Sequence, residues 1–513
     1  MHQPSLSAAR QRRPVLEWLS TVDHKKLGLL YLYTTMFFFG VGGILALLVR
    51  TQLAVADNHF VSNDVYNQIF TMHASTMILL FLIPIWAGFG SYMVPLQIGA
   101  RNMAFPRINA LSFWLLPPAG LIMFSGFLVS GGAAQAGWTA YSPLARTLGT
   151  GMDLWIIAVV ILGISSTIGA ANFLVTMFRL RAPGVTIFHM PIFCWTMLVT
   201  SFLQLLATPV LVAALVMLFI DRNFGGSFFD PNGGGNVILW QNVSRFYSHP
   251  AVYITILPGM GIVSEVLPVF SRKPLFGYKA VVFATVGIGG LGFAVWAHQV
   301  FTNGVVMKPY VGLMTAMIGV PTGVMSFNWL GTMWRGSLEF TTPMLFAIGF
   351  ISMFLIGAID GSYSAATPVD FAIHDTYFEV AQLHYVLFGG GVFAVFGGMY
   401  YWFPKIWGRK LNETLGKIHF TLMIIGLNFT FFPMHVLGLN GMPRGIVTYT
   451  SSSGWDTLNL FSSIGAFIIA LSMFPFLVNC FMAFRRPKDQ PNDPWEGNTL
   501  EWWTTFATPS TQL

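Results

Sequence analysis

Long apolar stretches, separated by short polar segments, follow one another along almost the whole chain. A helix needs roughly 20 apolar residues to cross the hydrocarbon core of a bilayer. Twelve stretches approach or exceed that length, at 27–49, 69–94, 110–132, 154–178, 192–220, 247–270, 279–301, 309–334, 343–361, 379–403, 418–438 and 458–484. Because no soluble domain or Ser/Gly-rich linker is left over, the pattern predicts an all-α polytopic membrane protein with a single twelve-helix domain, residues 1–513.

The composition agrees with a membrane location. The 513 residues are 55% hydrophobic and only 9% charged, whereas a soluble protein is about 25% charged. Mean hydropathy is +0.66, which excludes an ordinary soluble domain.

Lysine and arginine accumulate in cytoplasmic loops, so their positions predict the orientation. If the N-terminus is inside, most of the 26 basic residues fall on the inner side. We therefore predict that both ends are cytoplasmic, at 1–26 and 485–513. The same asymmetry explains the net charge of +7 without a nucleic-acid partner. The basic residues left outside are Arg50, Arg146, Arg222, Arg245, Lys308 and Arg444.

Four histidines lie near one end of four different apolar stretches: His73, His249, His298 and His384. In the predicted orientation, all four occupy the outer third of the bundle. Ionisable side chains inside a bilayer are costly and mark functional sites. Imidazole is above all a ligand for haem iron or copper, so the four positions predict a shared metal or haem region.

Local spacing refines this prediction. His249 and Tyr253 are four residues apart and share one helical face. Gln382 and His384 are two residues apart, about 200° around a helix, so they face opposite sides. The helix that carries them is therefore placed between two cofactor positions.

Motifs along nearly the whole chain resemble those of subunit I of the haem-copper oxidases. The cytochrome c oxidase branch is the most similar, in its subgroup with Tyr-Ser-His-Pro, here residues 247–250. Further matching segments are 21–26, 103–107, 112–118, 228–231, 271–278, 321–323, 374–377 and 441–444.

The resemblance implies that His73 and His384 are the two axial ligands of a low-spin haem, of type a or b. Two neutral imidazoles saturate the iron and suit it to electron transfer. Arg50 and Arg444 match arginines at the haem periphery. His374 and Asp375 match a magnesium position whose remaining ligand comes from another subunit.

The chain departs from the family at the oxygen-reducing centre. His249 and His298 match two copper ligands, beside Tyr253, but Gln299 stands where the third histidine belongs. Gln382 stands where a second, high-spin haem has its histidine. A neutral amide is a poor donor to either metal, so the second haem and the copper are left open.

The residues that would supply protons also differ from those of the family. Asn102 and Met325 stand where related oxidases carry an acid and a lysine in their proton channels. Neither an amide nor a thioether takes a proton near neutral pH. Ala251 stands where a glutamate is frequent, although the Tyr-Ser subgroup lacks that glutamate as well.

Together these departures favour a respiratory subunit that transfers electrons through the low-spin haem and is catalytically silent or altered at the second centre. Two alternatives stay open: a working terminal oxidase, which passes electrons from cytochrome c to O2, with an unusual ligand set, and a nitric oxide reductase. The resemblance implies four kinds of partner: a cupredoxin-like subunit II, a subunit III, cytochrome c or a similar one-electron donor, and a catalytically active paralogue.

Overall fold

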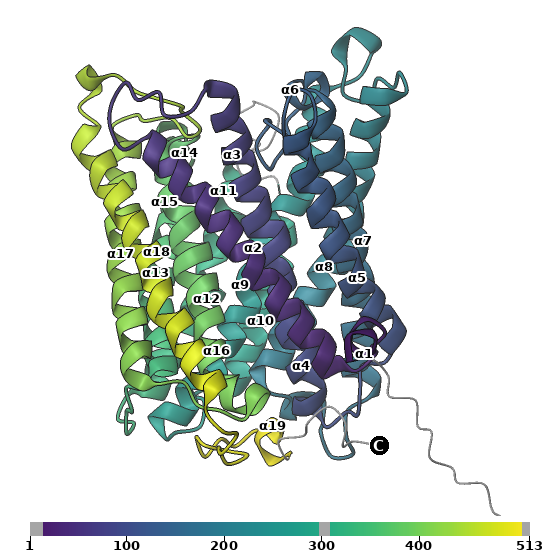
Figure 1. Cartoon of the computed structure of the whole chain (residues 1–513), viewed down its shortest axis with the longest axis vertical. Helices are drawn as coiled ribbons and strands as arrows, with labels where there is room; N and C mark the ends of the chain where they lie inside the picture. The colour runs from purple at the N-terminus through teal and green to yellow at the C-terminus, as the bar shows by residue number, and fades with distance from the viewer. Residues whose placement is uncertain (1–13, 297–307, 505–513) are drawn as a thin grey trace, which may run out of the picture.

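The computed structural model describes residues 14–296 and 308–504. These residues form an upright bundle of long helices, shown in Figure 1. Within the described ranges, β-pairing is limited to one isolated bridge between Thr376 and Pro443. The expected all-α membrane architecture is therefore confirmed.

Eleven helical spans of the described chain are long and apolar enough to cross a membrane. A shorter apolar helix, α10 (Tyr278–Ala294), covers most of the seventh expected stretch; residues 297–301 of that stretch lie outside the described residues. The eleven spans are α2 (His24–Gln52), α3 to α4 (Asn63–Ile98), α5 with a 3-10 turn (Pro106–Leu128), α7 (Thr150–Arg179), α8 (Ile192–Asn223), α9 (Val237–Ser271), the end of α11 with α12 (Gly312–Met333), α13 (Thr342–Ser364), α15 to α16 (Tyr377–Trp407), α17 (Glu413–Leu439) and α18 (Asp456–Arg485).

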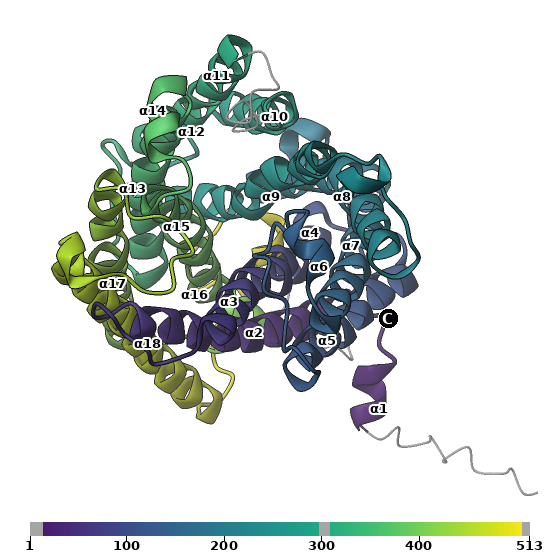
Figure 2. The ribbon, with the colours of Figure 1, turned by 90° about the horizontal axis from the view of Figure 1, so that it is seen from above.

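Most consecutive spans pack side by side around the bundle. The closest partners include α17 with α18, α8 with α9, and α7 with α8. Figure 2 shows this order from above, with the colours running around the molecule from α2 through α7 to α13 and α18. Short connections favour such antiparallel neighbours.

Two of the candidate histidines belong to the two most deeply buried spans of the described chain. In Asn63–Ile98 and Val237–Ser271, 78% of the most apolar window is buried, against 28% in His24–Gln52. His73 and His249 belong to the first two of these spans, and His384 belongs to the half-buried span Tyr377–Trp407. Three of the four candidate histidines therefore belong to the more buried spans of the bundle.

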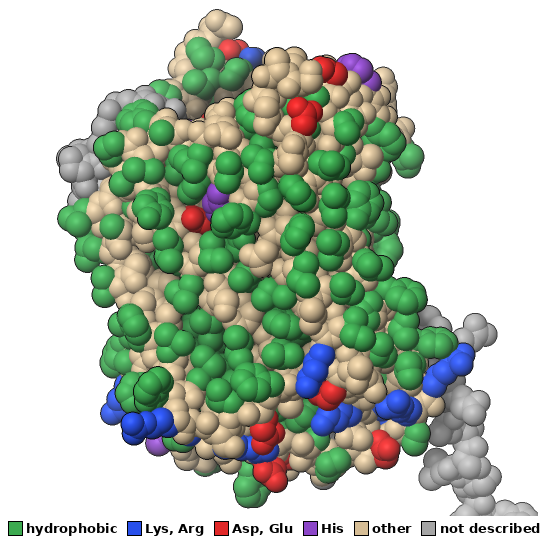
Figure 3. Space-filling model, turned by 90° about the vertical axis from the view of Figure 1, so that its left-hand side faces the viewer, with side chains coloured by type: hydrophobic (Ala, Val, Ile, Leu, Met, Phe, Trp, Pro, Cys, Tyr) green, Lys and Arg blue, Asp and Glu red, His purple; other side chains and the backbone are tan. Residues whose placement is uncertain are grey.

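The exterior is suited to lipid, with basic side chains gathered at one end. Figure 3 shows hydrophobic side chains over most of one face and Lys and Arg near its lower edge. At that end, the Asp23 carboxylate caps α2 by accepting hydrogen bonds from the backbone N–H groups of Lys25 and Lys26. Which end faces the cytoplasm stays a prediction.

Candidate functional site

The rings of His73 and His384 face each other across the bundle interior. His73 belongs to α3 (Asn63–Ser75), and His384 is the last residue of α15 (Tyr377–His384). Their ring centroids are 6.5 Å apart and their planes differ by only 3°. Phe431 of α17 stacks on the His384 ring at a centroid distance of 4.3 Å.

Hydrogen bonds select the ring nitrogen that each histidine presents. Nδ1 of His73 lies 2.9 Å from the carbonyl oxygen of Gly42. Nδ1 of His384 lies 2.7 Å from the carbonyl oxygen of Val380. A carbonyl only accepts, so each Nδ1 carries the proton and donates it. The lone pair on each Nε2 is left for a metal, as in most metal-binding histidines.

The spacing of the two rings fits one iron ion. Two metal–imidazole bonds of about 2 Å, together with the two ring radii, span roughly 6 Å. The measured 6.5 Å agrees with that requirement. The expected pair of axial ligands is thus brought together with suitable spacing.

The backbone departs from regular α-helix next to both histidines. A π-helical segment, η1 (Thr76–Leu82), begins three residues after His73. A second, η6 (Tyr385–Val392), begins directly after His384. Such segments are rare and are frequent at functional sites. The spacing of apolar residues in the sequence does not predict these π-helical segments.

Arg50 is buried near the end of α2, with a relative exposure of 5%. Its Nη2 donates to the carbonyl oxygen and the side-chain oxygen of Asn459 and to Ser463 Oγ. Nε and Nη1 have no hydrogen-bond partner among the described residues. Two buried N–H groups without partners suit an acceptor on a bound cofactor, because leaving them unpaired is costly.

The residues expected at the second centre line a cavity of about 260 Å³. Tyr253 OH lies 3.3 Å from His249 Nε2, so the expected contact on one helical face is present. Gln382 lines the same cavity, and its side-chain oxygen accepts a hydrogen bond of 3.4 Å from Ser364 Oγ. His298 and Gln299 lie outside the described residues.

The three positions expected to have lost a proton path lie apart from one another. Asn102 is at the basic end, where its side-chain N–H donates to the carbonyl oxygen of Val22. Met325 is fully buried in α12 (Gly319–Met333). Ala251 is buried in α9 beside Tyr247.

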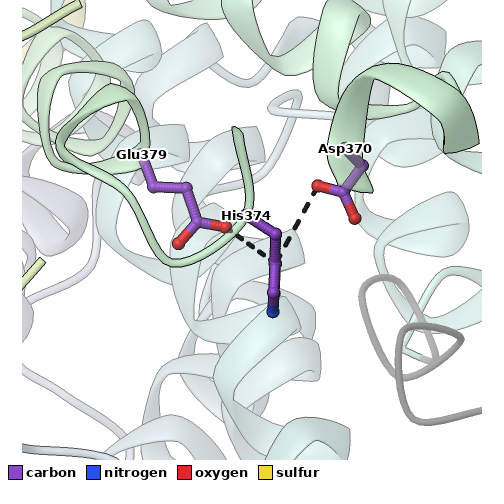
Figure 4. Close-up of side chains that lie close together, drawn as sticks. All are labelled: Asp370, His374 and Glu379. Carbon is purple, nitrogen blue, oxygen red and sulfur yellow. Dashed lines mark ion pairs between the residues drawn. The ribbon is translucent and has the colours of Figure 1, made fainter. Parts of the chain in front are cut away.

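At the end of the bundle where α3 begins, Arg444 is surrounded by acids. It forms ion pairs with Asp375 and with Glu379, whose Oε2 lies 2.9 Å from Nη1. Nδ1 of His374 lies 3.1 Å from Glu379 Oε1 and 4.0 Å from Asp370 Oδ1, and Figure 4 shows both contacts.

Electrostatics at this cluster reflect burial and close charges. Burial raises the pKa of the Asp370 carboxyl to about 6, although His374 acts in the opposite direction. Burial acts to lower the pKa of His374, but the Glu379 carboxylate outweighs it and the pKa is raised.

The sequence interpretation missed Asp370 and Glu379. The four-residue spacing of Asp370 and His374 was a usable signal, because it places both on one side of a helical turn. Glu379 was detectable as an acid in the first turn of an apolar span, where charge is costly.

The fold and the paired histidines define a class: an integral membrane protein whose helical bundle presents metal-ligating side chains to its interior. The sequence model of the family described as "Cytochrome C and Quinol oxidase polypeptide I" matches residues 26–468. The chain belongs to this family of respiratory oxidoreductase subunits, which use haem and copper.

Relatives and a solved structure agree with the family. Cytochrome c oxidase subunit 1 of Thermostichus vulcanus is 48% identical over 95% of this chain and 88% of its own length. The protein of the same name from Corynebacterium efficiens is 49% identical over 96% and 86%. A haem-copper terminal oxidase dimer shares the fold, with a TM-score of 0.78 at 16% identity, over 91% of this chain and 85% of that one.

Proposed function

We propose that this chain is a subunit I-like component of a respiratory complex, which transfers electrons through a low-spin haem held by His73 and His384. The observation that carries the proposal is the parallel pair of rings, 6.5 Å apart, with both Nδ1 atoms bonded to carbonyl oxygens. A haem saturated by two imidazoles supplies one-electron transfer and leaves no open position for substrate.

The surrounding residues hold and tune this site. The carbonyl oxygens of Gly42 and Val380 keep both imidazoles in the tautomer that ligates through Nε2. Phe431 packs on the His384 ring and supports its orientation. Arg50 offers two buried N–H groups to an acceptor at the haem edge.

We further propose that the second centre is catalytically silent or altered. The oxygen of Gln382 is engaged by Ser364, and an amide is in any case a weak ligand for iron. Without an imidazole at this position, a high-spin haem lacks its usual attachment.

A working terminal oxidase with an unusual ligand set is the second candidate. The contact between Tyr253 and His249 favours it, because a phenol beside a metal-bound imidazole can supply an electron and a proton. The cavity beside these residues offers room for a ligand.

A count of haem and copper in the purified complex separates the candidates when it is combined with carbon monoxide binding and when the cofactors held by the cupredoxin-like subunit and by any paralogue are subtracted. We expect this chain to hold one haem with a low-spin spectrum, no copper, and no carbon monoxide adduct. His384→Leu should abolish that spectrum. Two haems with a carbon monoxide adduct would refute the silent centre, and oxygen or nitric oxide consumption would then identify which reaction the centre performs.

Membership of the family also supports a proposal about the partner subunits of this chain and its cellular location. We propose that a cupredoxin-like subunit II and a subunit III surround the chain in a bacterial plasma membrane, with both termini cytoplasmic. Cytochrome c or a similar one-electron carrier is the proposed electron donor. A catalytically active paralogue of this chain is a further proposed partner.

A further inference from the structure

The cavity at the second centre has a carboxylate of the chain itself on its lining. Glu379 lies in the first turn of α15 with a relative exposure of only 3%, and it lines the cavity together with Gln382 and Arg444. Glu379 and Gln382 are three residues apart, so they share one helical face and are separated by roughly 4.5 Å along the axis. The carboxylate therefore lies almost one turn from the position at which a second haem would need an imidazole.

Both carboxylate oxygens of Glu379 are engaged within the chain. Oε2 accepts a hydrogen bond of 2.9 Å from Nη1 of Arg444. Oε1 lies 3.1 Å from Nδ1 of His374, a contact that Figure 4 shows. Short charge-assisted contacts of this kind fix the orientation of a side chain, so Glu379 is held at the cavity wall beside Arg444.

The arginines that line the cavity already have partners within the chain. Nη2 of Arg444 pairs with the Asp375 carboxylate, and a backbone hydrogen bond from Arg444 N to the carbonyl oxygen of Asp375 joins the two segments. Arg245 lines the cavity as well, and its Nη2 donates to the hydroxyl of Tyr141 at 2.9 Å. Glu379 thus completes, from within the chain, the negative charge around Arg444.

A haem brings negative charge of its own into a site. It carries carboxylate side groups at one edge of its ring, and arginines at the haem periphery bind such groups by charge-assisted hydrogen bonds. A carboxylate brought to Arg444 would meet Glu379, and like charges a few ångströms apart in a shielded interior repel each other. The residues at this edge of the cavity therefore do not fit a second haem, and this mismatch is separate from the amide at Gln382.

We infer that Glu379 is a specificity-determining residue, which excludes a haem from the second cavity by occupying Arg444 with the chain's own carboxylate. This inference rests on the proposed silent second centre and deepens it, because it makes the exclusion of haem a matter of charge as well as of a missing ligand. It follows that Gln382→His alone does not restore the site.

Haem uptake by variants of the full complex tests the assignment. Each variant is purified with its accompanying subunits, and its haem content and carbon monoxide difference spectrum are compared with those of the wild type, so that the cofactors of other subunits cancel. We expect no additional haem in Gln382→His. Combining it with Glu379→Gln should raise uptake at least about tenfold over Gln382→His and give a carbon monoxide adduct, because one repulsion between like charges is removed.

Asp360→Asn is the matched control, because it also changes a buried carboxylate into an amide. Asp360 pairs with His435, with 2.8 Å between Oδ2 and Nε2, and not with Arg444. Combined with Gln382→His, it should leave the haem content at the level of Gln382→His. Glu379→Ala in the same background should repeat the gain seen with Glu379→Gln, and an unchanged low-spin haem spectrum shows that each variant is folded.

The outcomes separate this inference from the proposal on which it rests. Equal haem uptake by Gln382→His and by its combinations with Glu379→Gln and Glu379→Ala would overturn the inference, as would an equal gain with Asp360→Asn. A second haem in the wild-type chain would instead refute the silent centre itself.

Discussion

Replacing Arg50 by methionine distinguishes a haem-binding arginine from a structural one by the sign of the effect. Arg50 is 5% exposed, and Nε and Nη1 have no hydrogen-bond partner within the described residues. If both donate to the haem, their loss costs about 1.5 to 3 kcal/mol each. Methionine also removes a buried charge, so we expect a net loss of about 2 to 4 kcal/mol, or roughly 30- to 1,000-fold weaker haem retention.

The assay is haem transfer from the purified complex to an excess of a haem-scavenging apoprotein, followed by visible absorption. Ser463→Ala is the control, because it removes one of the contacts of Arg50 Nη2 and leaves Nε and Nη1 unchanged. We expect this control to weaken haem retention by only about 0.5 to 1.5 kcal/mol. If no haem group accepts from Arg50, an apolar chain in place of a poorly paired buried charge should instead stabilise the protein by about 1 to 4 kcal/mol. Higher stability with full haem retention in Arg50→Met would therefore refute the reasoning.

Two further predictions concern packing and pH. A Cβ added at Gly465 would lie 2.4 Å from the backbone nitrogen of Thr430, whereas a Cβ added at Gly323 would meet nothing within 4 Å. Gly465→Ala should therefore lower the melting temperature of the complex. Gly323→Ala should leave the melting temperature unchanged or raise it slightly, because alanine is favoured over glycine in a helix by about 1 kcal/mol. Equal melting temperatures would contradict the close packing of α17 and α18. Burial raises the pKa of Glu501 above its ordinary 4.5, so the native state binds this proton more tightly than the unfolded state does. The contribution of Glu501 to stability therefore falls as pH rises from 4.5 to the raised pKa. Glu501→Gln should remove this pH dependence of the melting temperature, and identical pH profiles in wild type and variant would show that Glu501 is not the group responsible.

The bundle was predictable because bilayer thickness imposes a simple rule on helix length. Apolar stretches of about 20 residues located every span that the structure describes, but their ends were less accurate. The second stretch was expected from 69, whereas the helix begins at Asn63 with Ser62 as its N-cap. The first turns of this helix are polar, with Asn63 and Asp64, so a hydropathy pattern could not include them.

The parts of the candidate site that depend on residue type could be predicted from the sequence. The parts that depend on contacts between distant segments of the folded chain could not. His73 and His384 were recognisable as candidate ligands from their residue type, and the structure brings their rings together. The π-helical segments and the carbonyl partners of both rings arise from backbone geometry, which leaves no periodic signal. The contact of Glu379 with Arg444, 65 residues away in the sequence, likewise exists only because the fold brings the two side chains together.

The two sides of α15 explain how the proposed haem site can be retained while the proposed second centre is altered. Glu379, Gln382 and Val386 follow at three- and four-residue spacing and line the same cavity, as residues on one helical face do. His384 projects from another face toward His73 and is held by its own carbonyl contact and by Phe431. Gln382 bonds to Ser364, whereas His384 bonds to Val380 and packs on Phe431, so a ligand can change on one face without displacing the other. The proposed electron-transfer site can thus persist beside a cavity whose ligand set differs.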